Sequence, residues 1–371
     1  MAKYKLGDIA PIQQGSVPES ESYWLLNLDM VESNTGHIYE RLYVPFDKIG
    51  TSTIAFDTNN VLYSKLRPYL NKVVIPDCPG YATSEMLPLK PNKNYITREY
   101  LTYFLRSPKF VAYINEKTSG AKMPRANSSD LKSVEIECPT LENQRHITSE
   151  FDRIISIVRL RQQQLQKLDE LVKARFIELF GTIHDNRFGF GVVTLQDVSA
   201  PIKDGTHQTP TYTTDVENGY KFLSSKDVTT GKVDWSHLKY IPEELHRELY
   251  ARISPRRGDI LLAKNGTTGI AAIVDRDEVF DIYVSLALIR PHGVDPTYLW
   301  AAINAAETKQ QFDASLKGIG VPNLHLGEIK KARIILPPME LQEQFATFVE
   351  QTDKSKVAVQ KALDEDQLLF D

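Results

Sequence analysis

Apolar side chains recur at intervals of three and four residues along one long stretch in the middle of the chain. This spacing is typical of a heptad repeat, in which one face of an α-helix is apolar along its whole length. No proline or glycine occurs from Thr140, a residue suited to cap a helix, to Phe180. The pattern predicts a long helix over residues 140–181. Its apolar seam includes Ile147, Phe151, Ile154, Val158, Leu165, Leu168 and Val172.

A second stretch with the same spacing closes the sequence and predicts a helix over residues 338–371. Its seam includes Phe345, Val349 and Leu363, but it is less regular, because Lys356 stands where the first helix has Val158. Two heptad-patterned helices in one chain favour antiparallel pairing with each other as a coiled coil. The alternative interpretation is that each helix packs only on its own globular part.

The segments that precede the two helices have a different pattern. Short apolar runs such as residues 71–75 and 259–263 lie between turn residues and predict strands, whereas residues 98–106 and 296–305 predict short helices. We therefore predict an α+β protein with one α/β domain over residues 1–139 and a second over residues 192–337. Residues 182–191 are expected to link the first long helix to the second domain.

The two halves resemble each other in sequence, which indicates a tandem duplication and a pseudo-two-fold arrangement. A shift of 198 residues aligns glycine, proline and polar positions in the same order. The aligned pairs include Gly120 and Gly318, Pro124 and Pro322, Pro139 and Pro337, Glu142 and Glu340, and Gln144 and Gln342.

Charge constrains what the chain can bind by itself. The 371 residues contain 44 Lys and Arg and 48 Asp and Glu, and the net charge is −4. Residues 141–180 hold seven basic and six acidic residues and residues 338–371 hold three and eight, which leaves 34 of each elsewhere. Neutral globular parts neutralise few phosphates, so we expect partner subunits to supply most of any DNA affinity.

Cysteine usage and hydropathy predict a cytoplasmic protein that contacts no membrane. Cys78 and Cys138 are the only cysteines, as expected in a reducing compartment, and no apolar run is long enough to span a bilayer. The residues that follow Met1 do not form a signal peptide.

Motifs for catalysis are absent from the sequence. It has no phosphate-binding loop, no GxSxG elbow, no HExxH pair and no Asn/Asp-Pro-Pro-aromatic signature. The histidines are scattered, and His207 and His325 are expected to be surface contacts rather than metal ligands. We therefore expect no catalysis, no bound cofactor and no metal site.

Basic, aromatic and amide residues gather in two loops at matching places of the two halves, a combination suited to DNA. For any single residue a solvated surface charge is the slightly better interpretation, but the repetition favours a function for the group. The candidates are Lys65, Arg67, Tyr69, Lys72, Lys122 and Arg125 in the first half, and Lys264, Asn265, Thr267, Lys317 and Asn323 in the second.

These features together resemble the specificity subunits of type I restriction-modification systems. The resemblance covers essentially the whole chain. It includes residues 6–9 (LGDI), 204–210 (DGTHQTP), 258–261 (GDIL) and 173–181 (KARFIELFG), and the Pro-x-x-Glu-x-Gln openings of both helices. It adds Lys203, Thr206 and His207 to the candidate DNA contacts.

The resemblance implies a specific role. Each target-recognition domain would read one half of a bipartite, asymmetric site in double-stranded DNA, and the helix pair would set the spacing. Two methylation subunits would dock on the chain, and two restriction subunits could join them. S-adenosylmethionine, ATP and Mg²⁺ would be bound by those partners only.

Two features depart from the family pattern, and two other functions stay open. Residues 13–16 (QQGS) stand where the second half has residues 204–207, and the second helix is expected to be short. The alternatives are a separately expressed recognition part of a fused restriction-methylation enzyme and a coiled-coil adaptor that does not bind DNA.

Overall fold

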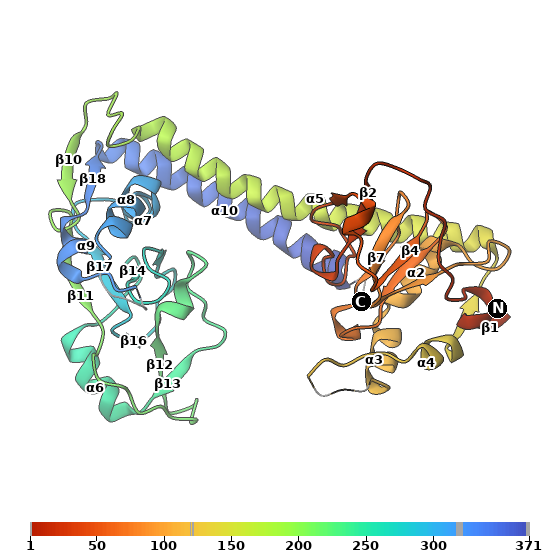
Figure 1. Ribbon diagram of the computed structural model, residues 1–371. Coiled ribbons are helices and arrows are strands. Elements are labelled where there is room, and N and C mark those ends of the chain that lie inside the picture. Colours follow the sequence, from red (N-terminus) through yellow and green to blue (C-terminus); the bar gives the residue numbers. More distant parts are fainter. Residues whose placement is uncertain (1, 119, 121, 317–321, 369–371) are drawn as a thin grey trace. The chain divides into compact units, whose positions relative to one another are not determined.

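The computed structural model describes residues 2–118, 120, 122–316 and 322–368 (Figure 1). Contacts divide the chain into two compact units. Unit 1 comprises residues 1–160 and 363–371, and unit 2 comprises residues 161–362. The boundary falls inside the long helix α5 (Leu141–Phe180), so both units include part of this helix.

Unit 1 contains three small sheets. The first pairs β1 (Ala2–Lys5) antiparallel with β9 (Glu135–Cys138). The second has the order β3 (Leu42–Val44), β2 (Tyr23–Leu26), β7 (Gly80–Thr83) and β4 (Thr53–Phe56), and β2 and β7 run parallel. The third has the order β6 (Val73–Val74), β5 (Val61–Ser64) and β8 (Met86–Leu89).

Short helices complete unit 1. They are α1 (Leu6–Ile9), α2 (Arg98–Arg106), α3 (Pro108–Glu116), α4 (Ser128–Ser133) and the 3-10 helices η1 (Leu28–Met30), η2 (Phe46–Lys48) and η3 (Pro68–Leu70). The side chains of Thr97 and Ser107 cap α2 and α3 by accepting backbone N–H groups of the first turn. Leu101, Leu105 and Phe110 are buried in the core beneath these helices.

Unit 2 repeats this plan. Strand β10 (Gly191–Thr194) pairs antiparallel with β18 (Arg333–Leu336). A second sheet has the order β11 (Ser199–Asp204), β17 (Leu286–Pro291), β14 (Ile260–Ala263) and β15 (Ala271–Ile273). A third has the order β13 (Lys239–Ile241), β12 (Tyr220–Leu223) and β16 (Phe280–Ile282), and β12 and β16 run parallel.

The helices of unit 2 follow a related order, in which α6 is added and no described helix takes the place of α1 or η3. They are η4 (Ser225–Val228), α6 (Glu243–Arg252), α7 (Pro296–Asn304), α8 (Ala306–Ala314), α9 (Leu326–Lys331) and α10 (Met339–Leu368). Helix α6 follows β13, where unit 1 has η2 and β4 after β3.

Equivalent hydrogen bonds recur in the two units, as expected for the duplication. In unit 1 the Thr97 N–H donates to Gln144 Oε1 at 2.9 Å, and in unit 2 the Asp295 N–H donates to Gln342 Oε1 at the same distance. Each glutamine also donates to the carbonyl of the proline five residues before it. Both glutamines are fully buried, so this bond fixes the start of each long helix on its own unit.

Within unit 2, the second half of α5 contacts α10. Phe176 and Phe180 of α5 pack on Phe345 of α10, with ring centroids 5.6 Å apart in both cases. Further along, Lys356 Nζ of α10 lies 2.7 Å from Asp169 Oδ1 of α5. The contact positions rise along one helix as they fall along the other, so these two segments run in opposite directions.

The heptad pattern agrees with the exposure of the side chains. Every predicted seam residue is buried or half-buried, whereas Leu160, Leu171 and Val357, which lie off the seam, are exposed. Helix α5 lies within one residue of the bounds predicted for it, and α10 begins one residue after its predicted start, while residues 369–371 lie outside the described residues. The protein has the predicted mixed α/β architecture.

Candidate nucleic-acid interface

The two basic loops of unit 1, residues 65–72 and 122–126, lie side by side. The Arg67 N–H donates to the Pro124 carbonyl at 2.8 Å, and the Ala126 N–H donates to the Lys65 carbonyl at 2.9 Å. Arg67 adopts a left-handed conformation with φ of 49° just before η3. The fold thus joins two loops that are more than 50 residues apart into one surface.

The half-buried carboxylate of Glu85 lies near two of the basic side chains of this surface. Glu85 accepts hydrogen bonds from Arg125 Nε and Nη2 at 3.0 to 3.2 Å, and its carboxylate lies 3.9 Å from Lys65 Nζ. The hydrogen bond to Glu85 raises the pKa of Arg125 above its ordinary value. Lys65 and Arg125 are therefore held in place, whereas Arg67 and Lys122 are exposed and form no ion pair with a described residue.

The remaining two candidates of unit 1 differ from each other. Tyr69 is exposed on η3. Lys72 instead donates from Nζ to the Leu28 carbonyl at 2.6 Å, and partial burial lowers the pKa of its ammonium group. Lys72 is thus bound to the unit's own backbone.

Unit 2 joins the equivalent loops by equivalent bonds. The Gly266 N–H donates to the Pro322 carbonyl at 3.2 Å, and the Leu324 N–H donates to the Lys264 carbonyl at 2.8 Å. Asn265 and Asn323 face each other in an isolated antiparallel bridge, as Leu66 and Arg125 do in unit 1. Thr267 is exposed at the tip of its loop, and the predicted contact Lys317 lies outside the described residues.

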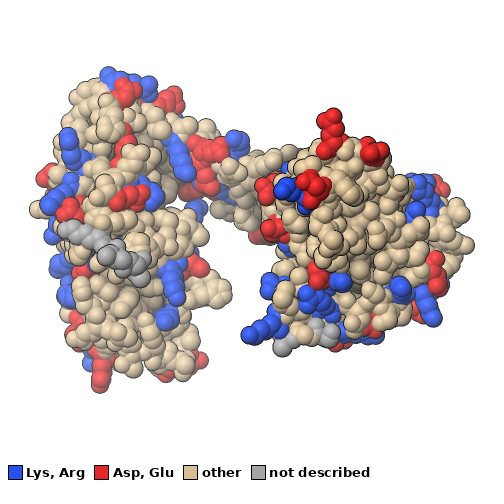
Figure 2. Space-filling view, in the orientation of Figure 1, with Lys and Arg blue, Asp and Glu red and all other residues tan. Residues whose placement is uncertain are grey.

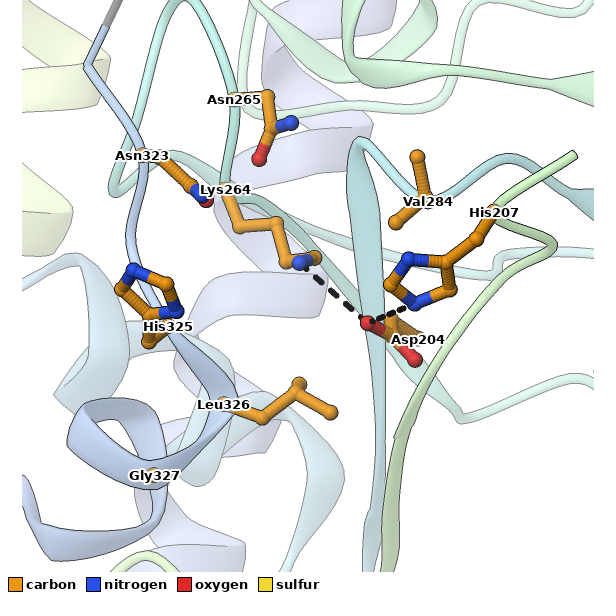
Figure 3. Close-up of a pocket in the computed structure, with 9 residues that line it drawn as sticks. All are labelled: Asp204, His207, Lys264, Asn265, Val284, Asn323, His325, Leu326 and Gly327. Carbon is orange, nitrogen blue, oxygen red and sulfur yellow. Dashed lines mark hydrogen bonds and ion pairs between the residues drawn. The ribbon is translucent and has the colours of Figure 1, made fainter. Parts of the chain in front are cut away.

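A pocket of about 470 Å³ opens where these loops meet the end of β11 (Figure 3). Lys264 is buried in it, with Nζ 3.3 Å from Asp204 Oδ2, and His207 Nε2 lies 3.0 Å from the same oxygen. The pocket is lined by Asp204, His207, Lys264, Asn265, Val284, Asn323, His325, Leu326 and Gly327. It therefore contains both histidines that the sequence analysis selected as surface contacts.

The amides of Asn265 and Asn323 leave hydrogen-bonding capacity in this pocket. The side-chain oxygen of each is buried without a hydrogen-bond partner among the described residues. Since buried polar atoms are nearly always hydrogen-bonded, these two amides are suited to a polar ligand such as a base edge.

The loop that carries His207 is held at several points. Thr206 is buried and its hydroxyl accepts the Gln208 N–H at 3.2 Å. Lys203 donates from Nζ to the Arg252 carbonyl at 3.3 Å, so its exposed side chain is tied to α6.

Most of the predicted basic residues that the structure describes lie at the two loop junctions, but sequence reasoning did not select the acidic residues and the arginine that hold these loops. These are Glu85, Asp204 and Arg252. Asp204 is part of the quoted DGTH motif, but nothing in the sequence indicates that a loop carboxylate will meet a lysine 60 residues away.

Figure 2 shows basic and acidic side chains mixed on the visible face rather than one continuous basic surface. In the described part of the chain, no three His, Cys, Asp or Glu side chains are grouped to hold a metal ion. No helix in the described ranges is sufficiently long and apolar to cross a membrane.

Comparison with known proteins gives a consistent result. The chain is 25% identical to the MjaVIII specificity subunit of a type I restriction enzyme from Methanocaldococcus jannaschii over 312 residues, 76% of this chain and 71% of the relative. It is 24% identical to the EcoBI specificity subunit of Escherichia coli over 66% of this chain and 56% of that protein.

Solved structures share the fold. One chain, from work on assembly and conformational transition of the type I R-M system, has a TM-score of 0.64 at 18% identity, and the match covers 100% of this chain and 94% of that one. The S subunit of a type I system from M. genitalium has a TM-score of 0.55 at 14% identity, covering 100% and 93%.

The family model for the type I restriction modification DNA specificity domain matches twice, over residues 1–170 and 189–366. The two matches together include both joined loops and most of both long helices. The chain therefore belongs to the family of type I restriction-modification specificity subunits.

Proposed function

We propose that each unit reads one half of a bipartite, asymmetric DNA site. The two long helices pair as an antiparallel coiled coil, which sets the spacing between the halves and gives the chain its pseudo-two-fold symmetry. Methylation subunits, two per chain, dock on this scaffold and transfer methyl groups to adenine. Two restriction subunits can join them.

The observation that carries this proposal is that the same loop junction is built twice with different side chains. Identical backbone bonds join residues 65–67 to 124–126 and residues 264–266 to 322–324. Both junctions have a lysine at the same position, but Arg67 and Arg125 stand at the first junction, whereas two asparagines stand at the second. Two loop junctions that share a backbone geometry but carry different side chains are suited to reading two different short DNA sequences.

The charge balance supports a role within a complex. The chain has a net charge of −4, and Glu85 and Asp204 neutralise part of the basic residues at the two junctions. Such a surface orients DNA and reads base edges but gives little affinity by itself. Partner subunits with their own phosphate contacts would supply the remainder, and S-adenosylmethionine would be bound by them.

The test is to express the chain together with its methylation subunit in a host and to map N6-methyladenine. We expect a two-part motif with a fixed gap, which disappears when this chain is omitted. A stable complex that methylates no such motif would contradict the proposal and favour the adaptor alternative.

Variants of the exposed basic residues test the interface itself. Changing Arg67 and Lys122 to Ala is expected to reduce methylation of one half-site motif and to lower the salt dependence of DNA binding by about one unit of slope per lost phosphate contact. Lys109→Ala removes an equally exposed charge from α3 and is the matched control. Equal behaviour of the control and the double variant would place the DNA elsewhere.

A further inference from the structure

The loop that carries Asp204 and His207 rests on the end of strand β16. The Thr206 N–H donates to the Ile282 carbonyl at 3.2 Å, and the Val284 N–H donates to the Thr206 carbonyl at 3.0 Å. A Cβ atom added to Gly205 would lie only 2.0 Å from the Ile282 oxygen. The loop backbone therefore lies directly against β16, with no room for a side chain at Gly205.

Helix α6 holds the same loop through Arg252, the last residue of the helix. Arg252 Nη2 donates to the Asp204 carbonyl at 2.7 Å and to the Gly205 carbonyl at 2.8 Å. Lys203 returns a bond from its Nζ to the Arg252 carbonyl at 3.3 Å. These bonds join the loop to the C-terminal end of α6.

A buried pair joins α6 to β16. His246 Nδ1 of α6 lies 2.7 Å from Asp281 Oδ2 of β16, and Asp281 is fully buried. The imidazole also stacks on Tyr220, with ring centroids 3.7 Å apart and the rings 8° from parallel. The loop, α6 and β16 thus form a closed ring of contacts in which each part is fixed by the other two.

The described part of unit 1 lacks this arrangement. The place of α6 in the chain is taken by η2 and β4, and Tyr81 stands on β7 where Asp281 stands on β16. The ring is therefore specific to unit 2. It accompanies the loop of residues 204–207, which is also specific to unit 2.

We propose that His246, Asp281 and Arg252 are positioning residues for this loop, and that they set the base preference of the half-site read by unit 2. This inference rests on the proposed function of the chain. His246 and Asp281 are too deeply buried to touch DNA, so they act through α6 and β16. Arg252 links their pair to the Asp204 and Gly205 backbone, and Asp204 in turn orients the imidazole of His207.

The first test compares two arginines of α6. Arg252→Ala removes the bonds to the loop, whereas Arg247→Ala removes an exposed charge that pairs only with Glu243 among the described contacts. N6-methyladenine is mapped for each variant in the complex with the methylation subunit. We expect Arg252→Ala to raise methylation of sites with one wrong base on the order of tenfold. This should occur in the half-site that His207→Ala also relaxes and in no other, and Arg247→Ala should match the wild type.

The second test separates positioning from direct DNA contact. His246→Ala breaks the buried pair, and we expect it to relax the same half-site as Arg252→Ala. His246→Gln retains a donor for Asp281 and should restore part of the discrimination. If Arg252→Ala alone has an effect, or if both half-sites relax equally, the proposal is wrong.

Amide hydrogen exchange tests whether Arg252 holds the loop, without a methylation assay. In the full-length chain, amides of residues 205–207 should exchange faster in Arg252→Ala than in Arg247→Ala. This measurement does not need His246→Ala to fold and does not depend on a methylated motif. A wild-type complex without a bipartite motif would overturn the proposed function, whereas unchanged exchange in Arg252→Ala would overturn this inference alone.

Discussion

Lys65 and Lys264 occupy the same position at the two loop junctions but differ in their surroundings. The carbonyl of each accepts a bond from the second loop, at 2.9 and 2.8 Å. The side chain of Lys264 is 7% exposed and lies 3.3 Å from Asp204, whereas that of Lys65 is 28% exposed and lies 3.9 Å from Glu85. Burial makes the loss of a charged partner more costly, so the two lysines should differ in their contribution to stability.

We expect Lys264→Met to lower the free energy of unfolding by ~1–3 kcal/mol, because Asp204 loses its one buried cation and keeps only the more exposed His207 and Arg252. Lys65→Met should cost less than ~1 kcal/mol, since Glu85 keeps its bonds to Arg125. Equilibrium urea unfolding of the full chain measures both values. Equal losses would mean that burial does not determine the strength of these pairs.

The burial of Asp281 predicts that the free energy of unfolding depends on pH. Burial raises its pKa to about 6 from an ordinary value of 3.8, although the hydrogen bond and charge of His246 oppose this rise. The folded protein therefore binds this proton more tightly than the unfolded chain. The stabilisation is complete below pH 3.8 and is lost as the pH rises through about 6.

Asp281→Asn removes this titration, because an amide does not titrate in this range. The unfolding free energy of the wild type minus that of Asp281→Asn should fall by ~1–3 kcal/mol between pH 4 and pH 7. Urea unfolding at several pH values measures the difference. A difference that rises with pH would show that the bond to His246 outweighs burial.

The sequence predicted the basic members of both junctions because their residue types are distinctive. It did not predict which of these side chains already bind another part of the chain. Lys72 was selected with its neighbours, yet its ammonium group binds the Leu28 carbonyl, a contact 44 residues away in the chain. Partners such as Glu85 and Asp204 are ordinary acidic residues until the fold places them beside a lysine.

Phe345 links elements that are distant in sequence. It is fully buried and packs on Phe176 and Phe180, while Phe180 also packs on Tyr298 of α7 at 4.9 Å. This aromatic cluster joins both long helices to the core of unit 2. The helices are therefore part of the core of the unit rather than appendages to it.

Phe345→Ala should lower the free energy of unfolding by about 3–5 kcal/mol, since it removes a ring from a packed core and leaves a cavity. Met339→Ala, an exposed position at the start of the same helix, should change it by less than ~0.5 kcal/mol. Thermal or urea unfolding distinguishes the two. A small effect of Phe345→Ala would mean that the cluster collapses to fill the space.

Both long helices and the short elements expected at residues 71–75, 98–106, 259–263 and 296–305 are present, whereas several other short elements were not predicted. The heptad spacing predicts both long helices, because many apolar positions recur on one face of each. The strand β1 has alternating charged residues and is mostly exposed, and its pairing with β9 depends on a segment more than 130 residues away. Helix α6 has few buried positions and was not predicted.

At the scale of the whole molecule, the duplication provides two units that share a backbone plan and differ in the segments inserted into it. The bonds of Gln144 and Gln342 and of the loop junctions are retained in both units. Unit 2 has gained α6 and a loop tied to it, whereas unit 1 has β4 at that place. Under the proposed function, two units with the same loop junctions and different inserted segments would read an asymmetric site without a change in the helices.

The proposed spacing role predicts that the gap in the DNA site follows the length of the helices. Seven residues inserted between Leu168 and Asp169 of α5 would preserve the heptad register and add ~10.5 Å at 1.5 Å per residue. An equal insertion between Lys356 and Val357 of α10 is needed, because Lys356 and Asp169 face each other at 2.7 Å. Base pairs are spaced ~3.4 Å apart, so the gap should grow by about three base pairs while both half-sites stay unchanged.

Mapping N6-methyladenine for the doubly extended chain measures the gap directly. The control is the insertion in α5 alone, which moves the residues before Asp169 by one heptad against α10 and should reduce methylation at every gap length. The helices would fail as a spacer if the doubly extended chain methylated the original motif, since a rigid pair of that length could not place both units on it. A longer gap with relaxed half-sites would instead mean that the insertion disturbs the units, because extension of the helices alone changes no residue at either loop junction.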